Sequence, residues 1–508
     1  MSAWIYLFSW SGVSGQLAVS NLGEYQLGNL PYTDPRNLTT LYDQLNVDYY
    51  YQNLLLGLRL ETFRASELDH RFVEISQKYL EGQTDHLRLR IGNYYAMLGR
   101  GVVLRAFELP GIIFEDKVYR RRYSLSRDLE GIIMKGTWPR IEFTLLRGEP
   151  LDSALPPGVE NLKRRQGLVE GGELRLRPWG WLMIGGTYLR TNRPDDQQQE
   201  VASALWQGSF QPLTEKFDLR DVTLDFYGEY AQVQGKLGTF LSLDSEQAHA
   251  LYLSANILYR SFGLSVEYKD YQSFDLGIND PPYLVKEHNL TLLNRSTHIL
   301  LPQNERGYQI EGTCGWSGYA TFAFNLSHAV NDLPHRETEF EERYGEVTVN
   351  FGPNLSAMFF YDRGKDGSIF HKSRDSWGTT ADWQMGHSYG FQLDLESQKV
   401  TRSFVPGQEE DFSNHFLSLS FLRSPRVALA VIGERSTDPF ETDNPETFDK
   451  VEKGPKYWLG VNLNYQISVE HELNIFYGHR RGGPACTAGT CYEVLPFEGL
   501  ELRLSSRF

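Results

Sequence analysis

Basic side chains gather in one segment of an acidic chain. The whole chain has 50 Lys and Arg against 65 Asp and Glu, a formal charge of −15. Residues 98–127 reverse that balance, with seven basic residues (Arg100, Arg105, Lys117, Arg120, Arg121, Arg122 and Arg127) against three acidic ones (Glu108, Glu115 and Asp116). Fixed charge of one sign in a narrow pore sets ion selectivity, so this segment would favour anionic solutes if it lined a pore. The same arginines could instead pair with acids of a surrounding wall or of lipopolysaccharide, and the sequence leaves both interpretations open.

Two further polar segments could carry a site. Residues 274–304 contain Lys286-Glu287-His288 and Asn294-Arg295-Ser296-Thr297-His298, which could line a binding surface or constriction, or could simply hydrogen-bond the loop. The two histidines lack a third ligand at a diagnostic spacing, so no metal site is predicted. The acidic segment 437–454 could bind Ca²⁺, but it lacks the glycine turn and ordered spacing of a calcium loop. A solvated acidic loop is the better interpretation.

Two of the three cysteines are predicted to form a disulfide. Cys486 and Cys491 stand in Cys-Thr-Ala-Gly-Thr-Cys, within a loop expected outside the cell, where a disulfide would pin a hairpin tip. A redox-active or metal-binding pair would be expected at Cys-x-x-Cys spacing, whereas four residues separate these two cysteines. Cys314 is then a lone thiol on a strand, and we expect it to be buried.

Enzyme motifs are missing from the sequence. It contains no HExxH, GxSxG or Walker A pattern, and no spacing among its 65 acids and 12 histidines singles out a catalytic pair. We therefore predict no enzyme activity, catalytic residue, cofactor or metal. The acidic balance argues against nucleic-acid binding. No run of 18 apolar residues occurs, which excludes a bundle of transmembrane helices.

Alternation of apolar and polar residues runs through the whole chain. In Gly499–Phe508, leucines at 500, 502 and 504 alternate with Glu501, Arg503 and Ser505. This period of two is what a strand needs when one face meets lipid and the other a wet lumen. The same alternation recurs around residues 56–61, 87–91, 173–177, 391–396 and 461–465. The final residue, Phe508, is the terminal aromatic typical of substrates of the barrel-assembly machinery.

The alternating segments number about 24, with 20 or 22 as the alternatives. Long connections such as 98–127, 150–167, 274–304, 437–454 and 483–495 alternate with tight turns such as Trp138-Pro139 and Ser424. Short turns at one end and long loops at the other are typical of outer-membrane barrels. The predicted fold is all-β, an antiparallel up-and-down transmembrane β-barrel in a bacterial outer membrane. An even strand count places both termini on the periplasmic side.

Residues 1–15 are short and apolar and end in small residues, as in the remnant of a secretory signal, although they could instead belong to a first strand. Residues 16–508 then form a single barrel domain. So little chain precedes the first strand that we expect no N-terminal plug domain. The segments 98–127 and 274–304 would narrow so wide a lumen instead.

Three stretches carry a family resemblance: residues 90–105 (RIGNYYAMLGRG followed by Leu104-Arg105), residues 281–298 (PPYLVKEH followed by LLNRSTH), and residues 482–503 (GGPACTAGTC followed by FEGLELR). Together they resemble a porin-like outer-membrane protein family of Gram-negative bacteria whose members have no assigned function. The resemblance implies a barrel in the outer membrane and implies no substrate or catalytic residue.

From these patterns we predict a channel for passive or weakly selective passage of small polar solutes. Its partners would be outer-membrane lipid, lipopolysaccharide and, during biogenesis, the barrel-assembly machinery. The alternative is a non-enzymatic anchor or subunit of an outer-membrane assembly for secretion or surface attachment. The predicted pore-lining or constriction residues are Arg59, Arg88, Arg90, Arg100, Arg105, Arg120, Arg121, Arg122, Arg175, Arg177, Asp394, Glu396 and Arg503. Each of them could instead form a salt bridge that braces the wall.

Overall fold

The computed structural model describes residues 15–66, 70–165, 167–192, 198–210, 221–234, 248–300, 304–333, 336–405, 407–441 and 456–508. The leader predicted at 1–15 therefore lies outside the described residues, apart from Gly15. Within the described part of the chain, no helix is both long and apolar enough to cross a bilayer.

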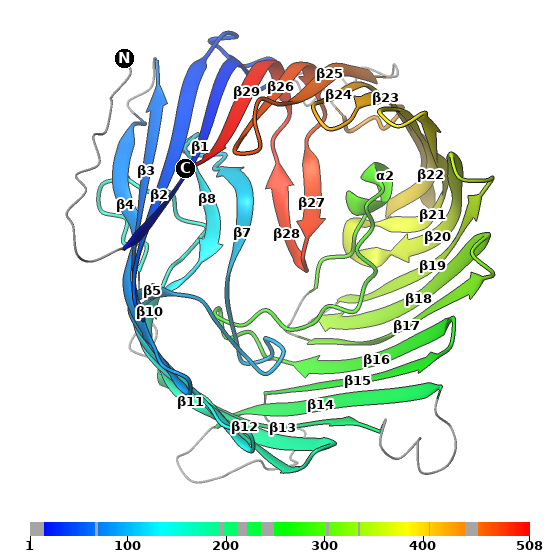
Figure 1. Cartoon of the computed structure of the whole chain (residues 1–508). Helices are drawn as coiled ribbons and strands as arrows, with labels where there is room; N and C mark the ends of the chain where they lie inside the picture. Colours follow the sequence, from blue (N-terminus) through cyan, green and yellow to red (C-terminus); the bar gives the residue numbers. More distant parts are fainter. Residues whose placement is uncertain are drawn as a thin grey trace.

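A single antiparallel sheet of 24 strands closes on itself to form the wall (Figure 1). Closure comes from pairing of the first strand with the last, with Ser20 opposite Arg507 and Asn29 opposite Glu498. The wall strands are β1 (Gln16–Asn29), β2 (Thr39–Tyr51), β3 (Leu54–Ala65), β4 (Phe72–Gln83), β5 (Leu87–Tyr94), β9 (Leu129–Thr137), β10 (Ile141–Pro150), β11 (Leu168–Trp179), β12 (Leu182–Asn192), β13 (Gln198–Ser209), β14 (Val222–Gln234), β15 (His249–Tyr259), β16 (Phe262–Gln272), β17 (Asn304–Trp316), β18 (Ala320–Leu333), β19 (Arg336–Asn350), β20 (Leu355–Asp366), β21 (His371–Met385), β22 (Tyr389–Val405), β23 (Gln408–Arg423), β24 (Val427–Ser436), β25 (Lys456–Gln466), β26 (His471–Arg480) and β29 (Phe497–Arg507).

The strand count and the barrel are thus confirmed. Strand β21 begins at His371, directly after the 3-10 turn η1 (Gly367–Ile369). The first five residues of this strand are all polar. Without apolar residues there is no alternation of apolar and polar side chains, so the sequence indicates the start of this strand only weakly.

The two faces of the wall meet different surroundings. In β29, Glu501 points inward and is 7% exposed, whereas Leu504 points outward and is 39% exposed. Outward apolar side chains continue on neighbouring strands as a belt that includes Leu56, Leu89, Ile141, Leu174, Phe359, Leu419, Leu459 and Tyr477. An apolar belt around a closed barrel is the surface that a bilayer requires.

Cys314 corrects one expectation. It was predicted to be buried, but it is exposed. It lies on β17 opposite Phe262 of β16 and Phe322 of β18, two exposed outward rings. Its position in the alternation therefore directs it out of the barrel, into the apolar belt.

Four inward glycines form a row across neighbouring strands of the wall. Gly460, Gly478, Gly499 and Gly28 lie side by side across β25, β26, β29 and β1. At Gly499 φ is +146° and a Cβ would lie 2.3 Å from the carbonyl oxygen of Leu27. Only glycine fits such an approach.

Candidate functional site

Three connections from the long-loop end fold back inside the ring (Figure 1). The first insert, residues 95–128, carries β6 (Ala96–Leu98), β7 (Leu104–Glu115) and β8 (Arg122–Arg127) as a small sheet. The second insert, residues 273–300, carries the short helix α2 (Thr291–Asn294), and the third insert, residues 481–496, is the hairpin β27 (Gly483–Thr487) and β28 (Thr490–Val494). The first two were the segments predicted to narrow the lumen. The third, predicted to lie on the extracellular side, also folds back into the ring.

An apolar core fastens the first insert to the wall. Leu98, Val102, Val103 and Leu104 are each at most 1% exposed. They cluster with wall side chains of β12–β16 and with residues of the second insert; the cluster includes Leu189, Val201, Leu205, Ala231, Tyr271, Phe274 and Leu276. Burial of a leucine or valine side chain contributes about 1.5–3 kcal/mol. The insert is therefore a packed part of the fold.

Hydrogen bonds fix the same turn to the wall. The backbone N–H of Gly99 donates to Glu173 on β11 at 2.6 Å, and that of Arg100 donates to Glu229 on β14 at 3.1 Å. The Arg100 guanidinium also donates to the hydroxyls of Tyr252 (3.1 Å) and Ser254 (3.2 Å) on β15. Arg100 is thus committed to docking the insert.

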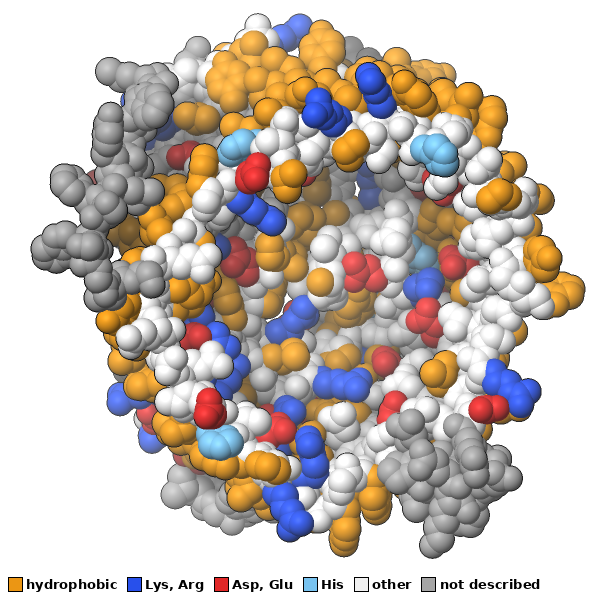
Figure 2. Space-filling view, in the orientation of Figure 1, with side chains coloured by type: hydrophobic (Ala, Val, Ile, Leu, Met, Phe, Trp, Pro, Cys, Tyr) orange, Lys and Arg blue, Asp and Glu red, His pale blue; other side chains and the backbone are white. Residues whose placement is uncertain are grey.

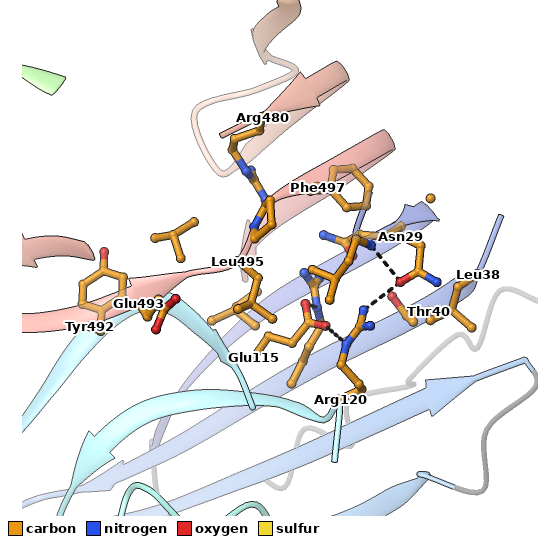
Figure 3. A pocket seen from close by; sticks show the side chains of 17 residues that line it. Asn29, Leu38, Thr40, Glu115, Arg120, Arg480, Tyr492, Glu493, Leu495 and Phe497 are labelled. Atoms are coloured by element: carbon orange, nitrogen blue, oxygen red, sulfur yellow. Dashed lines mark hydrogen bonds and ion pairs between the residues drawn. The ribbon is translucent and has the colours of Figure 1, made fainter. Parts of the chain in front are cut away.

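The arginine cluster at 120–122 is paired with acids and carbonyls, and Figure 3 shows Arg120 beside Glu115 and Asn29. Arg122 is 9% exposed and forms ion pairs with Glu24 of β1 and, at 3.0 Å, with Glu115 of β7. Arg120 binds Glu115 at 2.7 Å and donates to the side-chain oxygen of Asn29 at 2.9 Å. Arg121 donates to the Pro157 carbonyl at 2.5 Å. These contacts favour the wall-bracing interpretation over a free basic constriction.

Two more predicted arginines also brace the first insert. Arg59 of β3 binds Glu108 of β7 at 2.6 Å. Arg503 of β29 binds Glu24 and donates to the Gly111 carbonyl at 3.3 Å. Arg59 thus fastens the first insert directly. Arg503 binds both the insert and Glu24, the wall acid that pairs with Arg122.

The second insert is docked through buried polar groups. Glu396 of β22 accepts the backbone N–H groups of Thr291 (2.7 Å) and Leu292 (2.8 Å) at the start of α2. Arg295 forms a two-point pair with Glu434 of β24 at 2.5 and 2.9 Å. Glu396, predicted to line the pore, therefore anchors the helix.

His298 lies near the end of the second insert and is buried against the wall. It is 3% exposed, stacks on Phe340 at 4.5 Å between ring centroids, and contacts Asp366 at 2.9 Å and Glu305 at 3.4 Å. The two carboxylates outweigh burial and raise the pKa of His298 to about 9. The imidazolium form is thus the one that this site holds at neutral pH.

The third insert joins the other two. Its Cys486–Cys491 disulfide closes the hairpin, as predicted, and Cys486 exchanges two 2.9 Å hydrogen bonds through its backbone with the Asn294 side chain. Glu287 accepts the backbone N–H groups of Ala488 (2.9 Å) and Gly489 (3.0 Å). The hairpin tip is therefore tied to the second insert.

Arg105 completes the connection between inserts. It binds Asp280 of the second insert and the Ala488 carbonyl of the third, each at 2.6 Å. Burial raises the pKa of Asp280, opposed by the charge of Arg105. All three inserts thus form one body inside the barrel.

Three of the remaining predicted residues, Arg88, Arg90 and Asp394, lie beside open space in the lumen, whose hollow and charged lining are visible in Figure 2. A cavity of about 500 Å³ lies between α2 and strands β19–β23, and Asp394, Glu396, Glu346 and Lys286 line it. A second cavity, of about 260 Å³, lies on the β4–β5–β9 wall and is lined by Glu81, Arg88, Arg90, Tyr94, Tyr95, Ile133 and Lys135.

Arg175 and Arg177 of β11 pair with Glu173 (2.6 Å) and Glu142 (3.3 Å). Sequence reasoning missed Lys135, because the motif around it (Met134-Lys-Gly-Thr) gives no sign of what lies opposite. Its neighbour Arg88 is 47 positions away, across an insert. Only the pairing of β5 with β9 brings them together.

One group of metal-ligand types occurs in the described part of the chain. His328, Glu339 and Glu341 have ligand atoms within 4.8 Å of one another, but Lys365 already binds Glu339. In the acidic segment 437–454, Asp438 pairs with Arg402 and Glu441 with Arg481, while residues 442–454 lie outside the described residues.

A family model covers residues 26–360, described as a family of unknown function (DUF6029). The chain belongs to this family. The match covers most of the barrel wall and the first two inserts, and the family description assigns no activity. No curated protein matches the chain.

Solved structures with a similar architecture are outer-membrane proteins. OccAB4 of Acinetobacter baumannii aligns at 11% identity and a TM-score of 0.39, covering 73% of this chain and 97% of that one. The translocation pore of the P pilus usher PapC aligns at 11% identity and a TM-score of 0.47, covering 97% and 99%. OccK2 (OpdF) of Pseudomonas aeruginosa, in complex with glucuronate, aligns at 12% identity and 0.39, covering 76% and 96%. At these values the likeness assigns no function to this chain.

Proposed function

We propose that this protein is an outer-membrane channel for small polar solutes, with its pore narrowed by the three inserts and its termini on the periplasmic side. The observation that carries the proposal is the lumen itself. Away from the apolar core on β12–β16, charged and polar side chains line the lumen where the inserts leave cavities of about 500 and 260 Å³. If the inserts only had to fill the lumen, the side chains around them could be apolar. Ionisable side chains around open space instead suit a water-filled path for polar solutes.

The second candidate is a barrel that stays closed and serves as an anchor or subunit of a larger assembly. The apolar core between the first insert and β12–β16 favours it, because such packing resists displacement. The two candidates differ in whether solute passes through the folded barrel.

Liposome swelling separates them. The refolded whole chain is reconstituted in vesicles, and uptake of arabinose, glucose and a trisaccharide is followed by light scattering. The channel proposal expects uptake that falls as the solute becomes larger. Vesicles that contain folded barrel, as shown by heat-modifiable migration, and that exclude arabinose would favour the closed barrel.

A further inference from the structure

The wall at β4, β5 and β9 places like charges opposite one another. Arg88 of β5 and Lys135 of β9 are direct cross-strand partners, and both line the cavity of about 260 Å³. Directly opposite side chains on one face lie about 4.5–5.5 Å apart at Cβ, and like charges there are destabilising. Such a pair calls for a compensating anion.

Among the residues that line this cavity, one acid faces three cations. Glu81 of β4 binds the Nε atoms of Arg88 (2.6 Å) and Arg90 (2.5 Å). Within the described residues, Lys135 has neither an ion pair nor a side-chain hydrogen bond. The cavity therefore has three basic side chains against a single carboxylate.

The donors are held in place before any ligand arrives. Arg90 stacks on the Tyr79 ring, with its guanidinium carbon 4.1 Å from the ring centre, and Glu81 fixes one edge of both guanidinium groups. In the described part of the chain their Nη groups make no hydrogen bond. Planar guanidinium groups of this kind match the geometry of carboxylates and phosphates.

The cavity is reachable from the lumen. The Arg88 side chain is 48% exposed and Arg90 17%. Tyr94 and Tyr95, where β5 gives way to the first insert, complete the lining.

We infer that this cavity is a binding site for a small oxyanion, a carboxylate or phosphate group of a solute in the lumen, held by Arg88, Arg90 and Lys135. The inference rests on the proposed function only in that the solute reaches the site through the lumen. It assigns anion recognition to the β4–β5–β9 wall instead of the paired arginines at 120–122.

Isothermal titration calorimetry tests the site without requiring transport. The whole chain, folded in detergent at low ionic strength, is titrated with succinate and with inorganic phosphate. Wild type is expected to bind at least one of them, Lys135→Gln about tenfold more weakly, and Lys135→Arg nearly as tightly as wild type. The matched control is Lys286→Gln, which removes one lumenal charge beside the other cavity, where Lys286 binds Glu311 at 2.7 Å, and it should change the affinity less than twofold.

A thermal melt excludes a merely structural role for Lys135. Without ligand at low salt, Lys135→Gln should melt at the same temperature as wild type or higher, because it relieves the repulsion from Arg88. Absence of binding by wild type, equal affinity in Lys135→Gln, or a lower melting temperature of that variant without ligand would overturn the inference. Binding without solute uptake in the swelling assay would reject the channel and keep the site.

Discussion

Arg122 offers the sharpest test of how firmly the first insert is docked. It links β8 to β1 through Glu24 and to β7 through Glu115. Arg122→Gln removes a cation that is 9% exposed beside an acid that is 1% exposed. Breaking a buried pair by removing one partner costs about 3–5 kcal/mol.

The free-energy cost of Arg122→Gln is reduced because both acids that bind Arg122 keep another arginine partner. Glu115 keeps Arg120 at 2.7 Å and Glu24 keeps Arg503 at 2.9 Å, so we expect the loss to lie slightly below that range, about 2.7 kcal/mol. The loss falls on docking and not on the 24-strand ladder, because Arg122 lies outside the wall strands. Since about 1.36 kcal/mol corresponds to a tenfold change, the undocked population should rise about 100-fold.

Hydrogen exchange of the backbone amides in residues 104–127 reads that population directly. The control is Arg177→Gln, which makes the same chemical change at an ion pair that is 45% and 37% exposed and that should contribute at most about 1 kcal/mol. If Arg122→Gln exchanged no faster in this segment than Arg177→Gln, the docking role of the buried pair would be refuted.

Three further outcomes follow from the same contacts. His298 has a pKa raised to about 9 from about 6.5 in the unfolded chain, so its stabilisation, about 3 kcal/mol, is complete below pH 6.5 and is lost as the pH rises through 9. Thermal melts should show this slope in wild type and not in His298→Gln. Cys486→Ser opens a loop of sequence separation 5 and should lower hairpin stability by about 2 kcal/mol, speeding exchange at Ala488 and Gly489; unchanged exchange would contradict the role of the hairpin as a tie. Leu56→Arg on the outer belt should destabilise the barrel in bilayers by about 2–4 kcal/mol in urea unfolding, with Leu56→Met near wild type.

The wall was predictable because each strand meets two different solvents. In Gly499–Phe508 the leucines and the charged residues must lie on opposite faces of the strand. Because successive side chains of a strand point to opposite faces, this requirement appears in the sequence as a period of two. No distant contact is needed to recognise such a strand. The same signal failed at the lumenal hairpins, where both faces meet protein or water of similar polarity.

The roles of the arginines were not predictable for the opposite reason. Arg105 reaches Asp280 and Ala488, which lie 175 and 383 positions away. Nothing near Arg105 in the sequence indicates these partners. Likewise, Arg88 and Lys135 become neighbours only because β5 pairs with β9 across the first insert. Basic composition identified the segments, but only the register of the closed barrel shows which charges are paired.

The central claim is that solute passes through a barrel narrowed by these inserts. Single-channel recording of the refolded whole chain in planar bilayers tests it most directly, with a salt gradient to measure ion preference. The account predicts discrete, stable conductance steps that increase in Arg122→Gln. Folded wild-type and Arg122→Gln barrels that insert in the bilayer and remain silent would contradict it.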